Sequence, residues 1–410
     1  MAYVRTLTPD ELVNRIRAKL ETQPHKPSYS AYSVAPSPPE PAAYALIVGA
    51  GFSYGAVPLV RELMHETIGG YYCPDQDQSS LERPASVLRA DAANFWAEFN
   101  ETAANCGLPV VAVDGEGLPT DPGAAYRNLF TYEGANVLFA LKEARERVPS
   151  WLGRLQQQRD TAKPPDERRQ DPQDTGERFV KGFLRYVMDP GYEYGHGSTG
   201  RSDLNVAHVY LAALLEAQQT GLGWRTSAFC RTILTTNFDT LLQNALQMTN
   251  LLYMITDRPE RGLDRSEFVE EETAIHLVYT HGSILRHNPA SATGELDQLS
   301  DKNVEILRSH LQSRDVIAIG YSGWDDGLMA ALRRCDPSRH EVYWCDVLRE
   351  PAPHVADFLN QQANGAAYVC LGEFGADGFM RTLYQALIPK EAQRDPMLRW
   401  REWRAQVGSP

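Results

Sequence analysis

Short apolar segments alternate with amphipathic segments along much of the chain. Residues 45–48 form an uninterrupted apolar run, and comparable segments recur at 231–239, 275–283, 315–323, 341–347 and 366–374. Segments with apolar residues at helical spacing lie between them, at 208–219, 240–248, 301–313, 325–335 and 378–387. Buried strands that alternate with helices are typical of a parallel sheet covered on both faces. The pattern therefore predicts an α/β fold with a Rossmann-like, doubly wound parallel sheet.

A long segment, residues 58–205, interrupts this alternation. It contains no clear strand, but residues 85–104 and 135–155 carry apolar side chains at helical spacing. Residues 157–178 are polar, charged and interrupted by prolines, and residues 179–200 are rich in aromatic side chains and glycine. Both of these stretches predict loops. We therefore expect a large, mainly helical insertion within the sheet domain.

The two ends of the chain are expected to lie outside the sheet domain. Residues 1–40 combine an amphipathic helix at 8–22, which starts with a capping box, and a linker rich in proline and serine. This predicts a helix that is tethered to the domain and is not embedded in its sheet. The helix either packs on the domain surface or docks an oligomer or a partner. The sheet domain is then expected over residues 41–395, and residues 396–410 as a C-terminal tail.

Composition excludes several classes of function. The 410 residues carry a formal net charge of −13, which argues against direct nucleic-acid binding through the whole surface. No apolar run approaches the roughly 18 residues of a membrane span, and the N-terminus lacks a signal peptide, so no membrane partner is expected. The six cysteines form no CxxC pair. Reduced thiols in a cytoplasmic protein, without a zinc site, are therefore expected.

Ligands of open α/β sheets bind at the carboxyl ends of the strands, so the residues just after each strand carry the most information. The first such loop, Gly49, Ala50, Gly51, Phe52 and Ser53, follows the apolar run at 45–48. Its glycines allow a tight turn and a close approach to phosphate oxygens. The chain lacks both the acidic strand end of dinucleotide-binding dehydrogenases and the lysine of a Walker loop.

Polar residues follow two further strands. Thr236, Asn237 and Asp239 lie in "TTNFD", where the amide of Asn237 suits a ribose hydroxyl or a water. Asp239 either contacts a ligand or caps the next helix. His281 follows the strand at 275–279 and could act as a general base. His208, at the start of an apolar helix, is expected to pack beneath the site.

The fourth strand end is "GYSGWDD". Gly320 permits a close approach, and Ser322 could hydrogen-bond a ribose or a phosphate. Asp325 and Asp326 are expected to include the cap of the next helix, with a ligand contact as the alternative.

In this order, "GAGFS", "TTNFD", "THG" and "GYS" resemble the signature of the sirtuin (silent information regulator) family over residues 45–325, and the similarity extends to about residue 390. The resemblance implies an NAD site. It assigns the pyrophosphate to Gly49, Ala50, Gly51 and Ser53. It places Asn237 and Asp239 at the nicotinamide ribose, makes His281 the catalytic base, and assigns the adenosine ribose to Gly320 and Ser322.

The positions of the cysteines indicate which group of sirtuin-like proteins the chain resembles. Protein-deacetylating sirtuins carry a four-cysteine zinc module between the His-Gly and Gly-x-Ser motifs, whereas residues 283–319 contain no cysteine. The chain instead resembles the zinc-free, sirtuin-like proteins of bacterial antiphage systems, which hydrolyse NAD. The helical insertion at 58–205 fits that group. NAD is then expected as the substrate, with no further cofactor and no zinc.

The resemblance implies an NAD+ glycohydrolase that releases nicotinamide and ADP-ribose and depletes NAD during phage infection. Since the chain ends soon after the sheet, control is expected from a homo-oligomer or a partner. The expected partner is a HerA-type hexameric ATPase, with a short prokaryotic Argonaute as the alternative. Two other functions stay open: a non-catalytic subunit that binds NAD or ADP-ribose, and a deacylase or ADP-ribosyltransferase.

Overall fold

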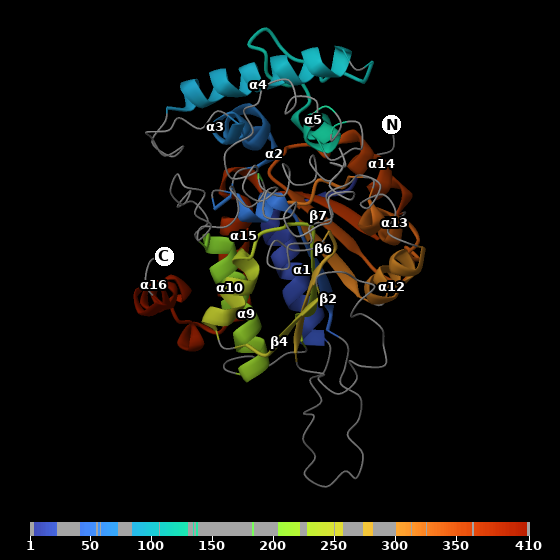
Figure 1. Ribbon diagram of the computed structural model, residues 1–410. Coiled ribbons are helices and arrows are strands. Elements are labelled where there is room, and N and C mark those ends of the chain that lie inside the picture. The colour runs from blue at the N-terminus through green and yellow to red at the C-terminus, as the bar shows by residue number, and fades with distance from the viewer. Residues whose placement is uncertain are drawn as a thin grey trace, which may run out of the picture. The chain divides into compact units, whose positions relative to one another are not determined.

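The structure, a computed structural model, describes residues 4–22, 42–54, 56–57, 59–72, 84–105, 107–129, 134, 137, 183, 204–221, 228–249, 251–256, 274–281, 301–312, 314–324, 326–362 and 365–407 (Figure 1). They fall into two compact units. One lies within Met1–Gly55, Leu204–Ser283 and Asp297–Ser409, and the other within Ala56–Asp203 and Ile284–Leu296. The two loops predicted at 157–178 and 179–200, except for the buried Phe183, and most of the helix predicted at 135–155 lie outside the described residues.

The first unit is built on a parallel sheet in which the described residues form eight strands. These are β1 (Thr6–Leu7), β2 (Tyr44–Val48), β3 (Cys230–Thr235), β4 (Tyr253–Thr256), β5 (Ile275–Tyr279), β6 (Asp315–Ile319), β7 (Val342–Asp346) and β8 (Ala366–Cys370). Their order is β1-β8-β7-β6-β2-β3-β5-β4, and every pair is parallel. The predicted Rossmann-like α/β class is confirmed.

The strand order reverses at β2. On one side of this central strand lie β3, β5 and β4, and on the other lie β6, β7, β8 and β1. β2 and β6 are buried at every position, as expected for central strands covered on both faces. A crevice for ligands is expected at such a switch point, outside the carboxyl ends of the strands.

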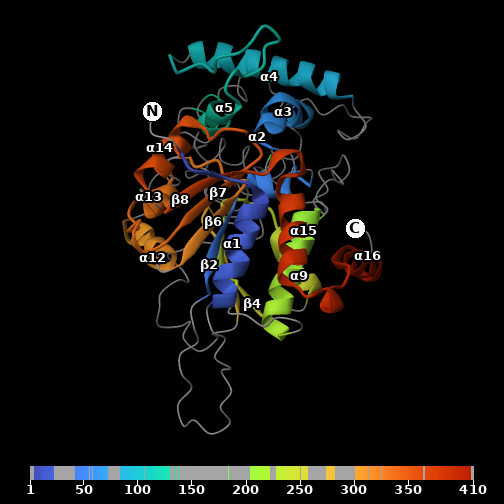
Figure 2. The same ribbon diagram turned by 180° about the vertical axis from the view of Figure 1, so that it is seen from behind.

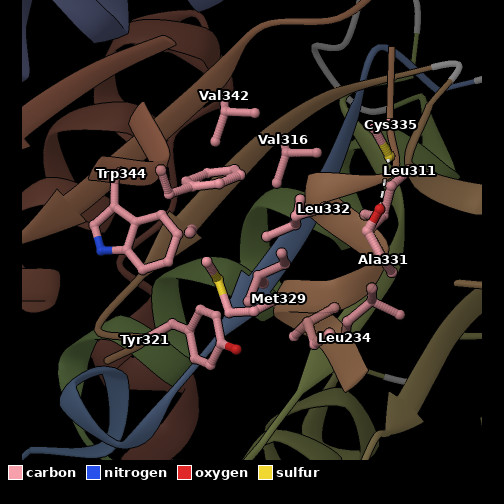
Figure 3. Close-up of a cluster of buried hydrophobic side chains, with 14 of the residues drawn as sticks. Leu234, Leu311, Val316, Tyr321, Met329, Ala331, Leu332, Cys335, Val342 and Trp344 are labelled. Carbon is pink, nitrogen blue, oxygen red and sulfur yellow. Dashed lines mark hydrogen bonds between the residues drawn. The ribbon is translucent and has the colours of Figure 1, made fainter. Parts of the chain in front are cut away.

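Helices cover both faces of the sheet (Figures 1 and 2). On one face lie α12 (Asp301–Leu311), α13 (Gly327–Arg333) and α14 (Pro353–Gln361), and on the other α1 (Pro9–Thr22), α9 (Val206–Thr220) and α15 (Gly375–Leu387). α10 (Leu241–Met248) and α16 (Pro396–Val407) pack against α9. Figure 3 shows the core on the first face, where Met329 and Leu332 of α13 lie among Trp344, Val316 and Leu234 of the sheet.

The described N-terminal segment belongs to the sheet unit, and the linker predicted after its helix lies outside the described residues. β1 pairs with β8 at the edge of the sheet, a pairing that the sequence analysis did not anticipate. The predicted helix forms as α1, and Thr8 and Glu11 make the expected capping box. α1 packs against α15 and buries its apolar stripe, Leu12, Val13, Ile16 and Leu20. This packing favours the interpretation of a helix docked on its own domain.

The C-terminal segment is also structured. Residues that were expected as a tail form α16, and its Arg399 pairs with Glu216 of α9. None of the helices among the described residues combines the length and the apolar character needed to cross a membrane.

The second unit is mainly helical in its described part, apart from residues 107–121. It contains α2 (Val60–Glu62), a π-helical turn η2 (Leu63–Thr67), α3 (Ile68–Tyr72), α4 (Ala85–Asn105) and α5 (Pro122–Leu129). α4 coincides with the helix predicted at 85–104. Its Phe95, Trp96 and Phe99 form a buried aromatic cluster, and the indole of Trp96 donates to the carbonyl of Met64 at 2.9 Å.

Candidate functional site

The strand register brings the four sequence motifs to one edge of the sheet. Val48, the last residue of β2, is the register partner of Thr235 in β3 and of Ile319 in β6. Thr235 is in turn level with Tyr279 of β5. The loops that begin after these four residues therefore leave the sheet together, although they are far apart in the sequence.

The loops after β2 and β6 cross in direct backbone contact. The N–H of Gly49 donates to the carbonyl of Ile319, and the N–H of Gly51 donates to that of Gly320, both at 3.0 Å. A Cβ on Gly49 would lie 2.4 Å from the Gly320 oxygen, and one on Gly51 would lie 2.8 Å from the Gly320 Cα. Gly320 itself has a positive φ of 62°. Glycine is therefore required at all three positions by the crossing itself.

This crossing also occupies part of the predicted phosphate loop. The N–H groups of Gly49 and Gly51 donate across the crossing, and the N–H of Phe52 donates to the Gly49 carbonyl at 2.9 Å. Residues 50–53 form a 3-10 turn, η1 (Ala50–Ser53), in which Ala50 is exposed and Phe52 is buried. Because the N–H groups of Gly49, Gly51 and Phe52 already donate to backbone carbonyls, other groups would have to bind an anion at this loop.

Ser53 is the centre of a buried cluster under the loop. Its side chain is fully buried, and its Oγ lies 3.0 Å from Asn237 Nδ2, 3.2 Å from Asp239 Oδ2 and 3.3 Å from His208 Nε2. The structure thus brings together Ser53, Asn237 and Asp239, which the sequence analysis had assigned to one site, and places His208 beneath them as expected.

The orientation of Asn237 follows from its partners. Its Nδ2 donates to the carbonyl of Gly49 at 3.2 Å and to Ser53 Oγ at 3.0 Å. A carbonyl oxygen only accepts, so the amide nitrogen, and not the oxygen, must face it. Both hydrogens of the amide are then directed at the loop, and Oδ1 points away from it. The side chain as a whole is half-buried.

The structure shows the helix-capping role considered for Asp239, together with a contact to Ser53. Its Oδ1 accepts from the N–H of Leu241 at 3.0 Å, which caps the start of α10, and its Oδ2 faces Ser53. Tyr279 donates its hydroxyl to the Asp239 carbonyl at 3.0 Å. Burial is the main cause that raises the pKa of the Asp239 carboxyl to about 6.

His281 has a carboxylate neighbour that the sequence did not reveal. Its Nε2 lies 3.3 Å from Asp326 Oδ2, at ion-pair distance but without the angle of a hydrogen bond, and both side chains are buried. The other oxygen of Asp326 accepts from the N–H groups of Leu328 and Met329 at 3.0 and 2.9 Å, which caps α13 as expected. The hydroxyl of Tyr321 donates to it at 2.7 Å.

Phe238 connects these two groups. It stands between Asn237 and Asp239 in the chain, and its ring lies 6.3 Å from that of His281, centroid to centroid. The Ser53 cluster and the His281–Asp326 pair therefore belong to one site.

Two further predicted site residues contact their neighbours through the backbone. Ser322 is exposed, and its carbonyl, not its hydroxyl, is engaged, by His354 Nε2 at 2.8 Å. Thr236 is half-buried and donates its N–H to the Val48 carbonyl at 3.1 Å. Gly282 and Asp325 lie outside the described residues. Within the described part of the chain, no three histidine, cysteine, aspartate or glutamate side chains gather in a way that could hold a metal ion.

A comparison with protein families matches one of them to the region that carries most of this site. Residues 231–363 match the SIR2-like domain. The matched region begins in β3 and contains Asn237, His281 and Ser322, while the loop after β2 precedes it. The match supports a sirtuin-like family and an NAD-related function in general. No match to a curated protein was found.

Proposed function

We propose that the protein is an NAD+ hydrolase that cleaves the bond between nicotinamide and ribose and releases nicotinamide and ADP-ribose. The observation that carries this proposal is the placement of Asn237 and His281 at one edge of a sirtuin-like sheet. Each is held by a further side chain, Asn237 by Ser53 and His281 by Asp326.

The chemistry of the bond fits these residues. Its cleavage develops oxocarbenium character at the anomeric carbon, as in glycoside hydrolysis. Nicotinamide leaves as a neutral base, so the protein needs to hold the substrate, position a water and accept a proton. The Oδ1 of Asn237 would hold the water or a ribose hydroxyl, and His281 would accept the proton.

Asp326 would decide which nitrogen of His281 acts as the base. A carboxylate beside Nε2 favours the tautomer in which Nε2 carries the proton. The lone pair is then on Nδ1, which we propose as the accepting atom.

Hydrolysis is favoured over protein deacylation because residues 283–319 contain no cysteine, and a four-cysteine zinc module could not form there. From the same resemblance we propose that the enzyme depletes NAD in antiphage defence in the cytoplasm. We propose that it does so as a homo-oligomer, controlled by a HerA-type ATPase or by a short prokaryotic Argonaute. These roles rest on the family likeness.

The test is NAD turnover by the purified protein, followed by chromatography of nicotinamide and ADP-ribose. We expect His281→Ala and Asn237→Ala each to abolish product release, because one removes the base and the other the group that holds the water. Asn360→Ala, at an exposed position of α14, is the matched control and should keep full activity.

Thermal unfolding of each variant shows whether it is folded. Turnover that persists in both folded site variants would disprove the assignment. Wild-type protein that binds NAD but releases no nicotinamide, also in phage-infected cells, would instead support a non-catalytic binding subunit. Transfer of label from NAD to protein would support an ADP-ribosyltransferase.

A further inference from the structure

A chain of hydrogen bonds runs from the start of α9 to Asn237. Asn205 precedes α9, and its Oδ1 lies 2.5 Å from His208 Nδ1. His208 Nε2 lies 3.3 Å from Ser53 Oγ, and Ser53 Oγ lies 3.0 Å from Asn237 Nδ2. His208 and Ser53 are both buried.

The partners of Asn205 determine the tautomer of His208. The Asn205 Nδ2 faces the carbonyls of Phe52 and Tyr54 at 2.7 and 3.3 Å, and carbonyl oxygens only accept. The amide nitrogen must therefore face them, and Oδ1 must face the imidazole. Two acceptors cannot share a contact without a proton, so His208 Nδ1 carries the hydrogen. In the neutral ring, Nε2 is then an acceptor.

Only one arrangement of the hydrogens around Ser53 then gives every polar atom a hydrogen-bond partner. Ser53 Oγ accepts from Asn237, so its single hydrogen goes either to His208 Nε2 or to Asp239 Oδ2. If it goes to Asp239, the buried Nε2 faces a hydroxyl that cannot donate to it. If it goes to His208, and Asp239 is protonated as its pKa of about 6 allows below that pH, Asp239 donates to the second lone pair of Ser53 and every polar atom of the cluster is paired.

Burial favours the same protonation states. It lowers the pKa of His208 to about 3, so the ring is neutral, and raises that of Asp239 to about 6, so the carboxyl is protonated below about pH 6. Among the described residues, two carboxyl groups lie near His208: Asp239, which contacts Ser53, and Asp377 of α15. The latter accepts from the N–H of Ala207 at 2.8 Å. Phe52 covers the imidazole with an edge-to-face contact at 5.1 Å.

We propose that Asn205 and His208 are positioning residues that act on Asn237 through Ser53. They fix the direction of the Ser53 hydroxyl, so that one of its lone pairs accepts from the Asn237 amide and Oδ1 is turned toward the site. This inference rests on the proposed function, because it explains how the group that would hold the water is held. Neither residue touches the substrate in this scheme.

The tautomer provides a test that does not depend on activity. The protein is labelled with ¹⁵N-histidine, and the His208 resonances are assigned by their loss in His208→Gln. We expect a neutral ring with the proton on Nδ1 from about pH 5 to 8, where an ordinary histidine would titrate. A ring with the proton on Nε2, or one that becomes doubly protonated in this range, would overturn the proposal.

The second test compares two substitutions of similar size. In His208→Gln, the glutamine Oε1 can still accept from Ser53, whereas His208→Leu fills the space without an acceptor. We expect His208→Gln to keep kcat for NAD cleavage within about threefold, and His208→Leu to lose about ten- to a hundredfold in kcat with little change in KM.

Equal losses in the two variants, or a loss that only follows a lower thermal stability, would show that His208 is merely structural. If His208→Leu does not fold, the tautomer and the activity of His208→Gln still decide the question. If the wild-type protein does not cleave NAD, the proposed function fails, while the tautomer measurement tests the hydrogen-bond chain unchanged.

Discussion

Asp239 and Asp326 each cap a helix with one carboxylate oxygen and turn the other toward a site residue, Ser53 or His281. A helix cap is a local role that can be anticipated from sequence, because it depends on the next three residues. The second contact of each carboxylate joins segments that are distant in the chain. The two roles can be separated experimentally, because asparagine caps a helix about as well as aspartate does.

Asp326→Asn should leave α13 capped and the protein folded, but lower NAD turnover by about a hundredfold or more. The asparagine amide would donate to His281 Nε2 and move the ring proton to Nδ1, where the base is needed. Turnover and thermal unfolding are measured together. An Asp326→Asn protein with wild-type kcat would show that the carboxylate does not orient His281.

The substitution Asp239→Asn tests whether folding raises the pKa of the Asp239 carboxyl. Burial raises the pKa of the folded-state carboxyl from 3.8 to about 6, so between these values only the folded protein binds this proton. Binding of this proton adds its full contribution to the free energy of unfolding below about pH 4, and the contribution is lost as the pH rises to about 6. A shift of about two units corresponds to about 3 kcal/mol.

Urea unfolding at several pH values measures this effect. The free energy of unfolding of wild type, relative to Asp239→Asn, should fall between about pH 4 and 6 and stay level above that range. A difference between the two proteins that does not vary with pH would mean that folding does not raise the pKa of this carboxyl.

At the scale of elements, the loops after β2 and β6 are coupled by their glycines. The structure explains Gly49, Gly51 and Gly320 by backbone contact between two loops, whereas the sequence pattern suggested contact with a phosphate. The two explanations are compatible, since a backbone crossing at the carboxyl edge also shapes the crevice. The crossing can be tested without a ligand.

Gly320→Ala should destabilise the protein by more than Gly372→Ala does. Both glycines have similar positive φ values, 62° and 63°, so the backbone strain of alanine, about 1 kcal/mol, is common to both. Only at Gly320 would the new Cβ meet backbone atoms at 2.5 Å, while nothing lies within 4 Å at Gly372. Thermal unfolding of both variants measures the difference, and equal losses would argue against a tight crossing.

At the scale of the whole molecule, the N-terminal helix is part of the sheet unit. Ile16 of α1 is completely buried, and Lys19 pairs with Asp315 at the start of β6. An arm reserved for a partner would instead leave its apolar stripe exposed in the single chain. The described packing therefore assigns α1 a role in stability.

Ile16→Ala should lower the free energy of unfolding by about 2–5 kcal/mol, because it removes buried volume between α1 and its neighbours. Arg17→Ala, at an exposed position of the same helix, is the control and should change stability by less than about 0.5 kcal/mol. Chemical unfolding and size-exclusion chromatography are run on both. A change in oligomeric state without a loss of stability would restore the interpretation of α1 as a docking arm.

The sequence by itself determined the Rossmann-like class, the main strands and helices, and the four polar strand ends, because these depend on local patterns of apolar and polar residues. It did not reveal β1 or β4, since a two-residue strand and a half-buried edge strand leave little apolar signal. Tertiary structure alone decided that Asp326 meets His281 and that His208 meets Ser53. Such contacts depend on strand order and register, which bring distant segments to one edge of the sheet and which no local pattern encodes.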